Sequence, residues 1–233
     1  MPQGRRASDR GRYGRLSRER VLATAVEVVD RDGLSGLSMR KLGAELGVEA
    51  MALYRYAPSK SDLLDGLVEA FCLELEADLA DLADQADQAE RPPRADWQRE
   101  LHRIALATYG VALRHPNVVP LLATRLLSTP LARRPTAVLR SDERVLALLR
   151  DAGLSDRRTV QLHRAFTAWL LGYLVVELRA MDDEPGEPDP AFRLGLHRMP
   201  AQEFPQLRAI ALALDDRGGP GQLAAGLDAL LGS

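Results

Sequence analysis

The chain has 233 residues and a net charge of −2 at pH 7, and a chain of this length buries a hydrophobic core without disulfides or metals. Its single cysteine, Cys72, excludes an intramolecular disulfide and favours a reducing cytoplasm. The longest apolar run, 168–176, is far shorter than the roughly 20 residues that a membrane helix needs. These features predict a soluble, cytoplasmic protein with no membrane segment and no secretory signal.

The charge is distributed unevenly along the chain. Residues 1–60 contain twelve Lys or Arg against seven Asp or Glu, a net charge of +5, and they include both lysines of the chain, Lys41 and Lys60. The remaining residues carry a net charge of −7. A basic head on an acidic body indicates that the first 60 residues contact a polyanion, although a solvated basic tail would produce the same asymmetry.

Apolar residues recur with helical spacing almost throughout, and the alternation typical of strands is absent, so the sequence predicts an all-α fold. Ser17 and Ser59 are good N-caps, the latter in a capping box with Asp62, and Gly33 can end the first helix. The acidic, proline-rich segment 182–190 is expected to be a loop or disordered. The expected helices span about 18–33, 38–47, 49–56, 60–88, 97–114, 117–127, 136–152, 155–181, 202–215 and 221–231.

Residues 38–56 form the strongest local pattern, two short helices joined by a tight turn, which predicts a helix-turn-helix. Gly43 allows the two helices to approach closely, and Gly47 can adopt the positive φ needed where the first helix ends. Apolar side chains seal the space between the helices (Leu42, Leu46, Val48 and Leu53). The second helix then presents small, aromatic and basic side chains suited to a major groove.

Residues 17–68 resemble the N-terminal domain of the tetracycline-repressor (TetR) family of transcription regulators. The resemblance rests on Arg40-Lys41-Leu42, Gly47-Val48, Leu53-Tyr54-Arg55-Tyr56 and Ser59-Lys60-Ser61-Asp62-Leu63-Leu64. A structural helical hairpin with no role in DNA binding is the alternative explanation of the pattern. The resemblance implies a DNA-binding regulator, a repressor by the habit of the family, with double-stranded DNA carrying a pseudo-palindromic operator as its partner.

Carried over position by position, the resemblance implies that Arg40 contacts a phosphate. Side chains that face base edges would be Ala50, Met51, Ala52 and Arg55. Those that contact the DNA backbone would be Tyr54, Tyr56 and Lys60. Ala50 and Ala52 cannot hydrogen-bond to bases, so direct readout would depend on Arg55, methyl contacts and DNA shape.

Residues 97–231 are similar, more loosely, to the C-terminal domain of the same family, which dimerises and holds the ligand. Trp97, Leu113-Arg114-His115-Pro116, Ala152-Gly153-Leu154, Gly172-Tyr173, Glu203-Phe204-Pro205 and Gly226-Leu227-Asp228 carry this similarity. A small apolar or aromatic effector is the implied ligand, and the candidate contacts are Trp97, Leu101, Tyr109, His115, Phe166 and Trp169. Tetracycline repressors place a drug-binding histidine where this chain has Glu76, so a metal–tetracycline complex is not the expected ligand.

The helix expected over 155–181 is apolar on all sides in its middle, so it needs cover from its own domain and from a partner. This pattern predicts a homodimer, with a fully buried helix of a monomer as the alternative. The sequence as a whole divides into a flexible basic arm (1–16), a helix-turn-helix DNA-binding domain (17–62) and a helical ligand-binding and dimerisation domain (63–233).

Two functions other than a ligand-responsive regulator are compatible with a helical chain of this kind. A helical enzyme is disfavoured because the four histidines show no metal-ligand spacing with each other or with Cys72, and no phosphate loop or nucleophile motif is present. We therefore expect no catalytic residues, no metal and no cofactor. The second alternative is a DNA-binding regulator controlled by a protein partner. A well-packed C-terminal core would favour control by a protein partner, whereas a roomy apolar cavity would favour control by a small molecule.

Overall fold

The computed structural model describes residues 16–87, 97–182, 195, 198–214 and 218–232, and every regular element within these ranges is a helix. The all-α prediction is therefore confirmed. The expected basic arm and the expected acidic loop fall almost entirely outside the described residues. None of the described helices is long and apolar enough to cross a membrane.

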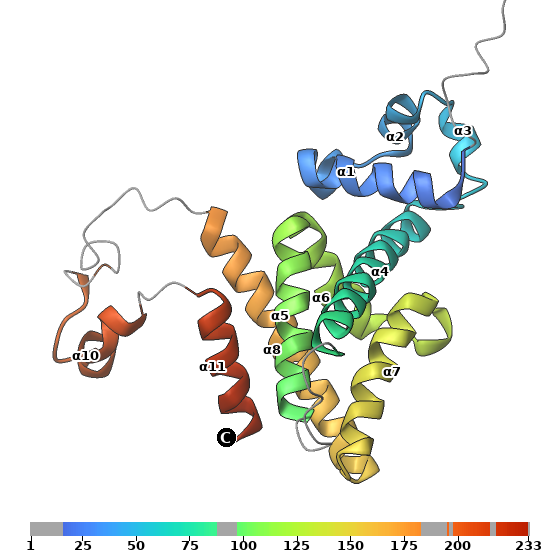
Figure 1. Ribbon diagram of the computed structural model, residues 1–233. Coiled ribbons are helices and arrows are strands. Elements are labelled where there is room, and N and C mark those ends of the chain that lie inside the picture. The colour runs from blue at the N-terminus through green and yellow to red at the C-terminus, as the bar shows by residue number, and fades with distance from the viewer. Residues whose placement is uncertain (1–15, 88–96, 183–194, 196–197, 215–217, 233) are drawn as a thin grey trace, which may run out of the picture.

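The N-terminal head consists of α1 (Arg18–Gly36), α2 (Met39–Leu46) and α3 (Ala50–Leu53) (Figure 1). Ser17 caps α1 by accepting a hydrogen bond from the backbone N–H of Arg20 at 3.3 Å. Gly33 interrupts the helical path at φ +70°, as predicted, although one further turn continues to Gly36. The third helix is shorter than expected, because the N–H groups of Tyr56 and Ala57 both bond to the carbonyl of Leu53 and close the helix there.

The long helix α4 (Lys60–Asp87) starts beneath the head and runs into the body (Figure 1). Its cap is half of a capping box: the Asp62 N–H donates to Ser59 Oγ at 3.1 Å, while the Asp62 carboxylate accepts from the Ser59 hydroxyl and not from its backbone N–H. Leu63 and Leu67 are fully buried near the head, and Leu79 is buried in the body. One rigid element therefore belongs to both cores.

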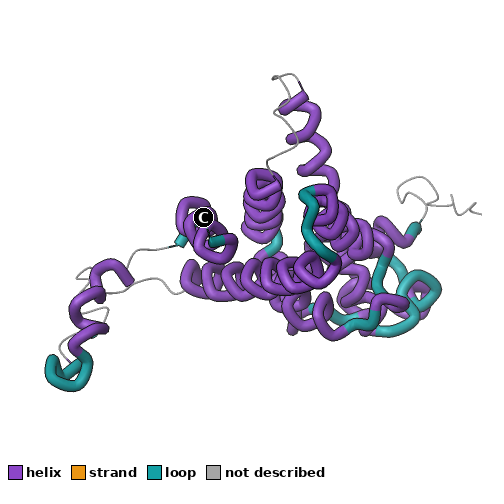
Figure 2. The backbone as a smooth tube through the Cα atoms, turned by 90° about the horizontal axis from the view of Figure 1, so that it is seen from below, coloured by secondary structure: helices purple, strands orange, loops and turns teal. Residues whose placement is uncertain are grey.

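The body elements are α5 (Trp97–Arg114), η1 (Pro116–Val118), α6 (Val119–Ser128), η2 (Leu131–Arg133), α7 (Thr136–Asp151), α8 (Asp156–Asp182), α10 (Pro205–Leu214) and α11 (Pro220–Leu231). Helix α4 packs against α5, α6 and α7, and α8 and α11 pack against α5 (Figure 1). The core of the body is made of fully buried leucines, among them Leu101, Leu149, Leu174 and Leu227. Helix α10 lies apart from the other helices in both views (Figures 1 and 2).

Candidate functional site

The turn between α2 and α3 has the geometry that the sequence pattern predicts. Ser38 caps α2 by accepting from the Lys41 N–H, and Gly47 ends it in the left-handed conformation at φ +68°. The Val48 N–H then donates to the Gly43 carbonyl at 2.9 Å. A Cβ at Gly43 would lie 2.8 Å from the Val48 carbonyl oxygen, so only glycine allows α2 and α3 to meet this closely.

The outer side of α3 and the turn after it carries the side chains expected to face DNA. Leu53 is fully buried and fixes the orientation of the helix, which leaves Met51 76% exposed and Tyr54 43% exposed. Ala52 and Arg55 are also exposed, and Ala50 is half-buried. Three of the four side chains expected at base edges are thus exposed, and Ala50 is partly covered.

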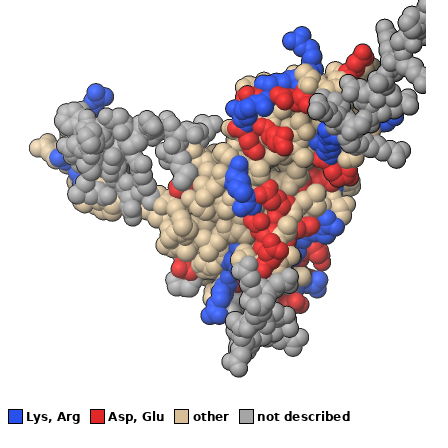
Figure 3. Space-filling view, turned by 45° about the horizontal axis from the view of Figure 1, so that its top comes forward, with Lys and Arg blue, Asp and Glu red and all other residues tan. Residues whose placement is uncertain are grey.

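The basic side chains of the head fall into two groups. Arg31 pairs with Asp32 and Glu45, and Lys41 lies 2.8 Å from the Asp32 carboxylate, so both cations are neutralised within the head. Arg40, Arg55 and Lys60 are exposed, and among the residues that the structure describes none of the three forms an ion pair. Figure 3 shows basic side chains on the outer edge of the head, with acidic ones beside some of them. These three cations, one in α2, one directly after α3 and one at the start of α4, are therefore available to a polyanion.

Tyr56 differs from its neighbours on the expected DNA surface. Its hydroxyl donates to the carbonyl oxygen of Leu16 at 2.9 Å, and the side chain is half-buried. The ring therefore holds the segment before α1 against the end of α3. This structural bond uses the hydroxyl proton that a contact with a DNA phosphate would need, and sequence reasoning did not anticipate it, because Leu16 lies 40 residues away.

Head and body meet along a polar contact that the sequence did not reveal. The Nδ1 of His115 lies 2.7 Å from an Asp30 oxygen of α1, and its Nε2 lies 2.7 Å from a Glu74 oxygen of α4. Asn117 adds a hydrogen bond from its amide to the Val29 carbonyl at 3.0 Å. His115, a predicted ligand contact, thus lies at the junction and joins η1 to the head.

An open crevice of about 250 Å³ lies beside this junction. Its walls come from α1, α4 and the segment around η1 (Ala23, Val26, Leu67, Ala70, Phe71, Glu74, His115 and Val118). Close to it, α1 and α4 touch: a Cβ at Gly66 would lie 2.3 Å from a Leu22 methyl carbon. Arg18 and Glu69 add an ion pair of 2.6 Å across the same contact.

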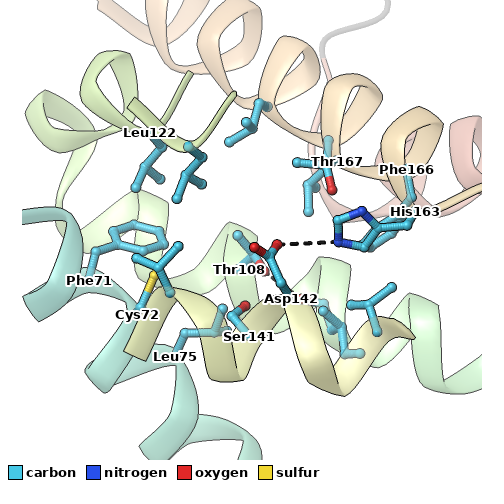
Figure 4. Close-up of a pocket in the computed structure, with 16 residues that line it drawn as sticks. Phe71, Cys72, Leu75, Thr108, Leu122, Ser141, Asp142, His163, Phe166 and Thr167 are labelled. Atoms are coloured by element: carbon cyan, nitrogen blue, oxygen red, sulfur yellow. Dashed lines mark hydrogen bonds and ion pairs between the residues drawn. The ribbon is translucent and has the colours of Figure 1, made fainter. Parts of the chain in front are cut away.

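A second, smaller cavity of about 70 Å³ lies in the centre of the body, among α4, α5, α6, α7 and α8 (Figure 4). Most of its walls are apolar, and Phe71 is shared with the junction crevice. Of the six predicted ligand contacts, only Phe166 lines it. Leu101 and Tyr109 are buried elsewhere, Trp97 is half-buried, and Trp169 packs against Gly226 of α11.

One end of this cavity is polar. Asp142 of α7 lies 3.3 Å from Nε2 of His163 on α8, and it accepts a hydrogen bond from Arg134 at 2.7 Å. Burial alone would raise the pKa of Asp142, but His163 and Arg134 together hold that pKa below its ordinary value. Cys72 also lines the cavity; burial raises the pKa of its thiol to about 12, which keeps the sulfur protonated.

The second half of α8 has an apolar stripe that the described residues leave exposed. Val176 is 70% exposed, and the small residues Ala168 and Gly172 lie on the same exposed stripe at spacings of four. Leu174 of the same helix and Leu227 of α11 are fully buried in the protomer, so neither is available to a second copy. Figure 3 shows a broad surface without charged side chains on the side of the body where α8 and α11 lie.

These features define a class of all-helical proteins in which a helix-turn-helix head is joined through one long helix to a larger helical body. Residues 21–67 match the family model for bacterial regulatory proteins of the tetR family, and residues 90–221 match that of the tetracyclin repressor-like C-terminal domain. The two matches cover the head and most of the body. The chain belongs to the TetR family.

Individual relatives agree with this assignment. The chain is 34% identical over 171 residues to the HTH-type transcriptional repressor DrrR1 of Streptomyces coeruleorubidus. The aligned residues make up 72% of this chain and 56% of that protein. The chain therefore spans little more than half the length of this curated relative.

Solved structures share the fold over almost the whole chain. A possible TetR family transcriptional regulator from Streptomyces coelicolor A3(2) is 25% identical, with a TM-score of 0.70 and coverage of 93% of this chain and 97% of that one. The Streptomyces coelicolor TetR family protein ActR, in complex with actinorhodin, is 21% identical with a TM-score of 0.74, covering 94% of this chain and 96% of that one. At that identity the likeness to ActR concerns the fold alone.

Proposed function

We propose that this protein is a DNA-binding transcriptional repressor that a small, largely apolar ligand releases from a pseudo-palindromic operator. The observation that carries the proposal is the exposed surface of α3 and the turn after it, with Met51, Ala52 and Arg55. Arg40, Arg55 and Lys60 are exposed there without an ion pair among the described residues. Proteins use such free cations to replace the counterions of DNA phosphates. The relative DrrR1 is named a transcriptional repressor, which supports repression and not activation as the role proposed for this protein.

Within this proposal the residues divide by role. Arg40, Tyr54 and Lys60 contact phosphates, while Ala50, Met51, Ala52 and Arg55 face base edges. Of the base-facing residues only Arg55 can hydrogen-bond through its side chain to a base, and Arg commonly binds the O6 and N7 of guanine. Tyr56 supports the surface from within through its bond to Leu16.

The test of DNA recognition compares two exposed arginines of the head. An operator is first selected from random duplexes with the wild-type protein. Arg55→Ala is expected to weaken operator binding by ~1–3 kcal/mol and to relax the preference at one base pair per half-site. Arg31→Ala is the matched control, since Arg31 is neutralised by Asp32 and Glu45. Equal losses for both variants, or no selected sequence at all, would contradict the proposal.

We also propose that the protein acts as a homodimer. The stripe of Ala168, Gly172 and Val176 on α8 would allow a second copy to approach closely, and α10 exposes Leu207 and Ile210. Apolar surface of this kind is stabilised by burial against a partner. A two-fold dimer presents two α3 helices to successive major grooves, which is the reason for expecting a pseudo-palindrome. The proposed domain division (17–62 and 63–233) places the dimer contacts wholly in the second part.

The ligand is proposed to act through α4. The core cavity of about 70 Å³ is about half the roughly 150 Å³ that accommodates benzene in an engineered protein, so a larger ligand must displace a wall. A close-packed core can yield only toward empty space. Phe71 is the wall residue that also borders the crevice between α1 and α4. Moving it toward that crevice would press on Ala23 and Val26 of the head and change the separation of the two α3 helices.

Thermodynamic linkage makes the ligand proposal testable. A ligand that lowers operator affinity by some factor must itself bind more weakly, by the same factor, when operator is present. The alternative regulator is a protein partner, and one observation favours it: the core cavity is small. A partner-controlled protein would bind no small apolar molecule in its core, whereas a ligand-controlled protein would bind one and lose operator.

A further inference from the structure

The head contacts the rest of the molecule at two separate places along α1 (Figure 1). At the first, the Gly66 backbone of α4 meets the Leu22 side chain so closely that a Cβ at Gly66 would lie 2.3 Å from a Leu22 methyl carbon. At the second, η1 and the residue before it contact α1 near Asp30. Leu22 and Asp30 lie eight residues apart, which is about 12 Å along an α-helix. Two supports at this separation can fix the angle between α1 and the body.

The first support allows α1 to turn. A glycine backbone packed against a leucine methyl group makes no directional bond, so it resists separation of the helices more than rotation. Arg18 and Glu69 add an ion pair of 2.6 Å, but the Arg18 side chain is 44% exposed, and exposed pairs contribute little. The contact with α4 is therefore a pivot, and the angle of the head depends on the second support.

The second support consists of directional contacts from one imidazole. Nδ1 of His115 lies 2.7 Å from an Asp30 carboxylate oxygen, and Nε2 lies 2.7 Å from a Glu74 oxygen, so one ring connects α1 to α4. Glu74 also accepts a hydrogen bond from Nε of Arg114. The other carboxylate oxygen of Asp30 is buried and has no hydrogen-bond partner among the described residues. The Asp30 side chain thus depends on His115, whereas Glu74 does not.

Asn117 strengthens the same support through the backbone of α1. Its amide donates to the Val29 carbonyl at 3.0 Å and to the Asp30 carbonyl at 3.2 Å. Gly33 interrupts the helical path shortly afterwards, and carbonyls in the last turn before such an interruption can accept bonds from outside the helix. The body therefore holds both the backbone and the side chain of Asp30, and α1 cannot turn about the pivot without breaking these bonds.

We propose that His115 is a positioning residue that sets the half-site spacing accepted by the dimer, because it holds the head at one angle to the body. Any rotation of α1 about the pivot carries α3 with it and changes the separation of the two α3 helices. Without His115, the Asp30 carboxylate would lie near the Glu74 carboxylate with no partner, which favours a head turned away from the body. This role rests on the proposed function, since spacing has meaning only for a homodimer on a pseudo-palindrome.

The test measures operator binding as a function of half-site spacing. Starting from the selected operator, duplexes are made with one base pair inserted or deleted between the half-sites, which moves one half-site by ~3.4 Å and turns it by roughly 35°. Wild-type protein should bind these duplexes about 100-fold more weakly, because a rigid dimer cannot engage both half-sites at once. His115→Ala should lose only about tenfold, since its heads can turn to follow the half-sites. On the selected operator it should bind several-fold more weakly than the wild type.

His102→Ala is the matched control. Nε2 of His102 lies 2.9 Å from an Asp228 oxygen and its Nδ1 lies 2.9 Å from the Gln98 carbonyl oxygen, so this ring also contacts acceptors through both nitrogens, but within the body. His102→Ala should keep the wild-type spacing profile. A duplex with a single half-site tests the head itself, and wild type and His115→Ala should bind it equally well.

Variants of Asp30 test the same contact from the head. Asp30→Ala should broaden the spacing profile as His115→Ala does. The double variant should be no worse than His115→Ala alone, because the two side chains act through one contact. Asp30→Asn, whose amide oxygen can still accept a hydrogen bond from the ring, should restore most of the wild-type profile.

Each outcome supports or overturns the role of His115. If His115→Ala keeps the wild-type spacing profile on an operator that it binds, His115 does not set the spacing, while the proposed function stands. Additive losses in the double variant would also overturn the role, since the two side chains would then act separately. If circular dichroism shows that His115→Ala is unfolded, the contrast between Asp30→Ala and Asp30→Asn decides. If wild-type protein binds no pseudo-palindrome, this role and the proposed function are both overturned.

Discussion

The head and the body are both built from helices, but they differ in how tightly those helices pack. The head is small and tightly packed, with Leu42 and Leu53 fully buried, and its proposed function depends on side chains that project outward. The body contains a void among its helices and an uncovered apolar face, and its proposed functions depend on its interior and on that face. Packing defects would therefore be harmful in the head, whereas the body depends on incomplete packing.

The sharpest test of this contrast compares two helical glycines. Gly43→Val should remove operator binding almost completely and destabilise the head by ~1–3 kcal/mol or more, because its Cβ would lie 2.8 Å from a backbone oxygen that cannot move aside. Gly110→Ala in α5 is the control: a Cβ there meets only the end of the Arg114 side chain at 3.9 Å, so stability should rise by ~0.5–1 kcal/mol. Urea unfolding and gel-shift assays measure both. A tolerated Gly43→Val would show that the head is not tightly packed.

The second prediction concerns the uncovered face. Val176→Glu places a charge on the exposed stripe of α8, so it should split the dimer and weaken operator binding by one to two orders of magnitude while the helix content stays unchanged. Leu174→Glu, two residues away, should instead unfold the protomer because Leu174 is fully buried. Analytical ultracentrifugation and circular dichroism separate the two outcomes. A Val176→Glu variant that sediments as the wild type does would place the interface elsewhere.

A smaller effect is expected at the wall between the two voids. Phe71→Leu should reduce by several-fold the factor by which operator weakens the binding of a small apolar probe such as 2-methylnaphthalene, since the shorter side chain cannot press on α1. Leu75→Val is the matched control, because Leu75 lines the core cavity and not the junction crevice. The probe is titrated in the presence and absence of operator. Equal coupling factors in the two variants would argue against transmission through Phe71.

The smallest expected effect is the pH dependence of the body. The folded pKa of Asp142 is depressed, so its contribution to stability is complete above its ordinary pKa of about 4 and is lost as pH falls through the folded value. Asp142→Asn should therefore cost ~1 kcal/mol at pH 7, and the difference from the wild type should shrink at strongly acidic pH. Thermal unfolding at pH 7 and below pH 4 measures it, and a difference that grows toward acid would contradict this interpretation.

The predictability of the two regions also differs, for a physical reason. The head depends on local chemistry: Ser17, Ser38 and Gly47 lie within a few residues of the groups they cap or turn, so their roles could be predicted from spacing. Most body helices were placed within two residues for the same reason. Contacts between distant segments could not be predicted. Tyr56 with Leu16 and His163 with Asp142 depend on packing that no local pattern encodes.

The predicted ligand contacts illustrate this limit. Aromatic residues were favoured because ligand cavities are commonly aromatic, but the same residues fill cores. Trp169 packs on Gly226 and Leu101 is fully buried, so both fit a role in the core, and only Phe166 reaches the cavity. The polar residues that face it, Asp142 and His163, carried no signal in the sequence, because their meaning depends on their meeting across two helices.

The central claim is that the free cations around α3 bind DNA phosphates, and the salt dependence of operator binding tests it most directly. For each phosphate contact removed, the slope of log K against log salt should become shallower by ~0.9. Lys60→Ala removes one contact in each half-site of the dimer, so it should make the slope shallower by ~1.8. Arg31→Ala, whose cation is already neutralised by Asp32 and Glu45, should leave the slope unchanged. Identical slopes for the wild type and both variants, or binding that does not depend on salt, would contradict the account.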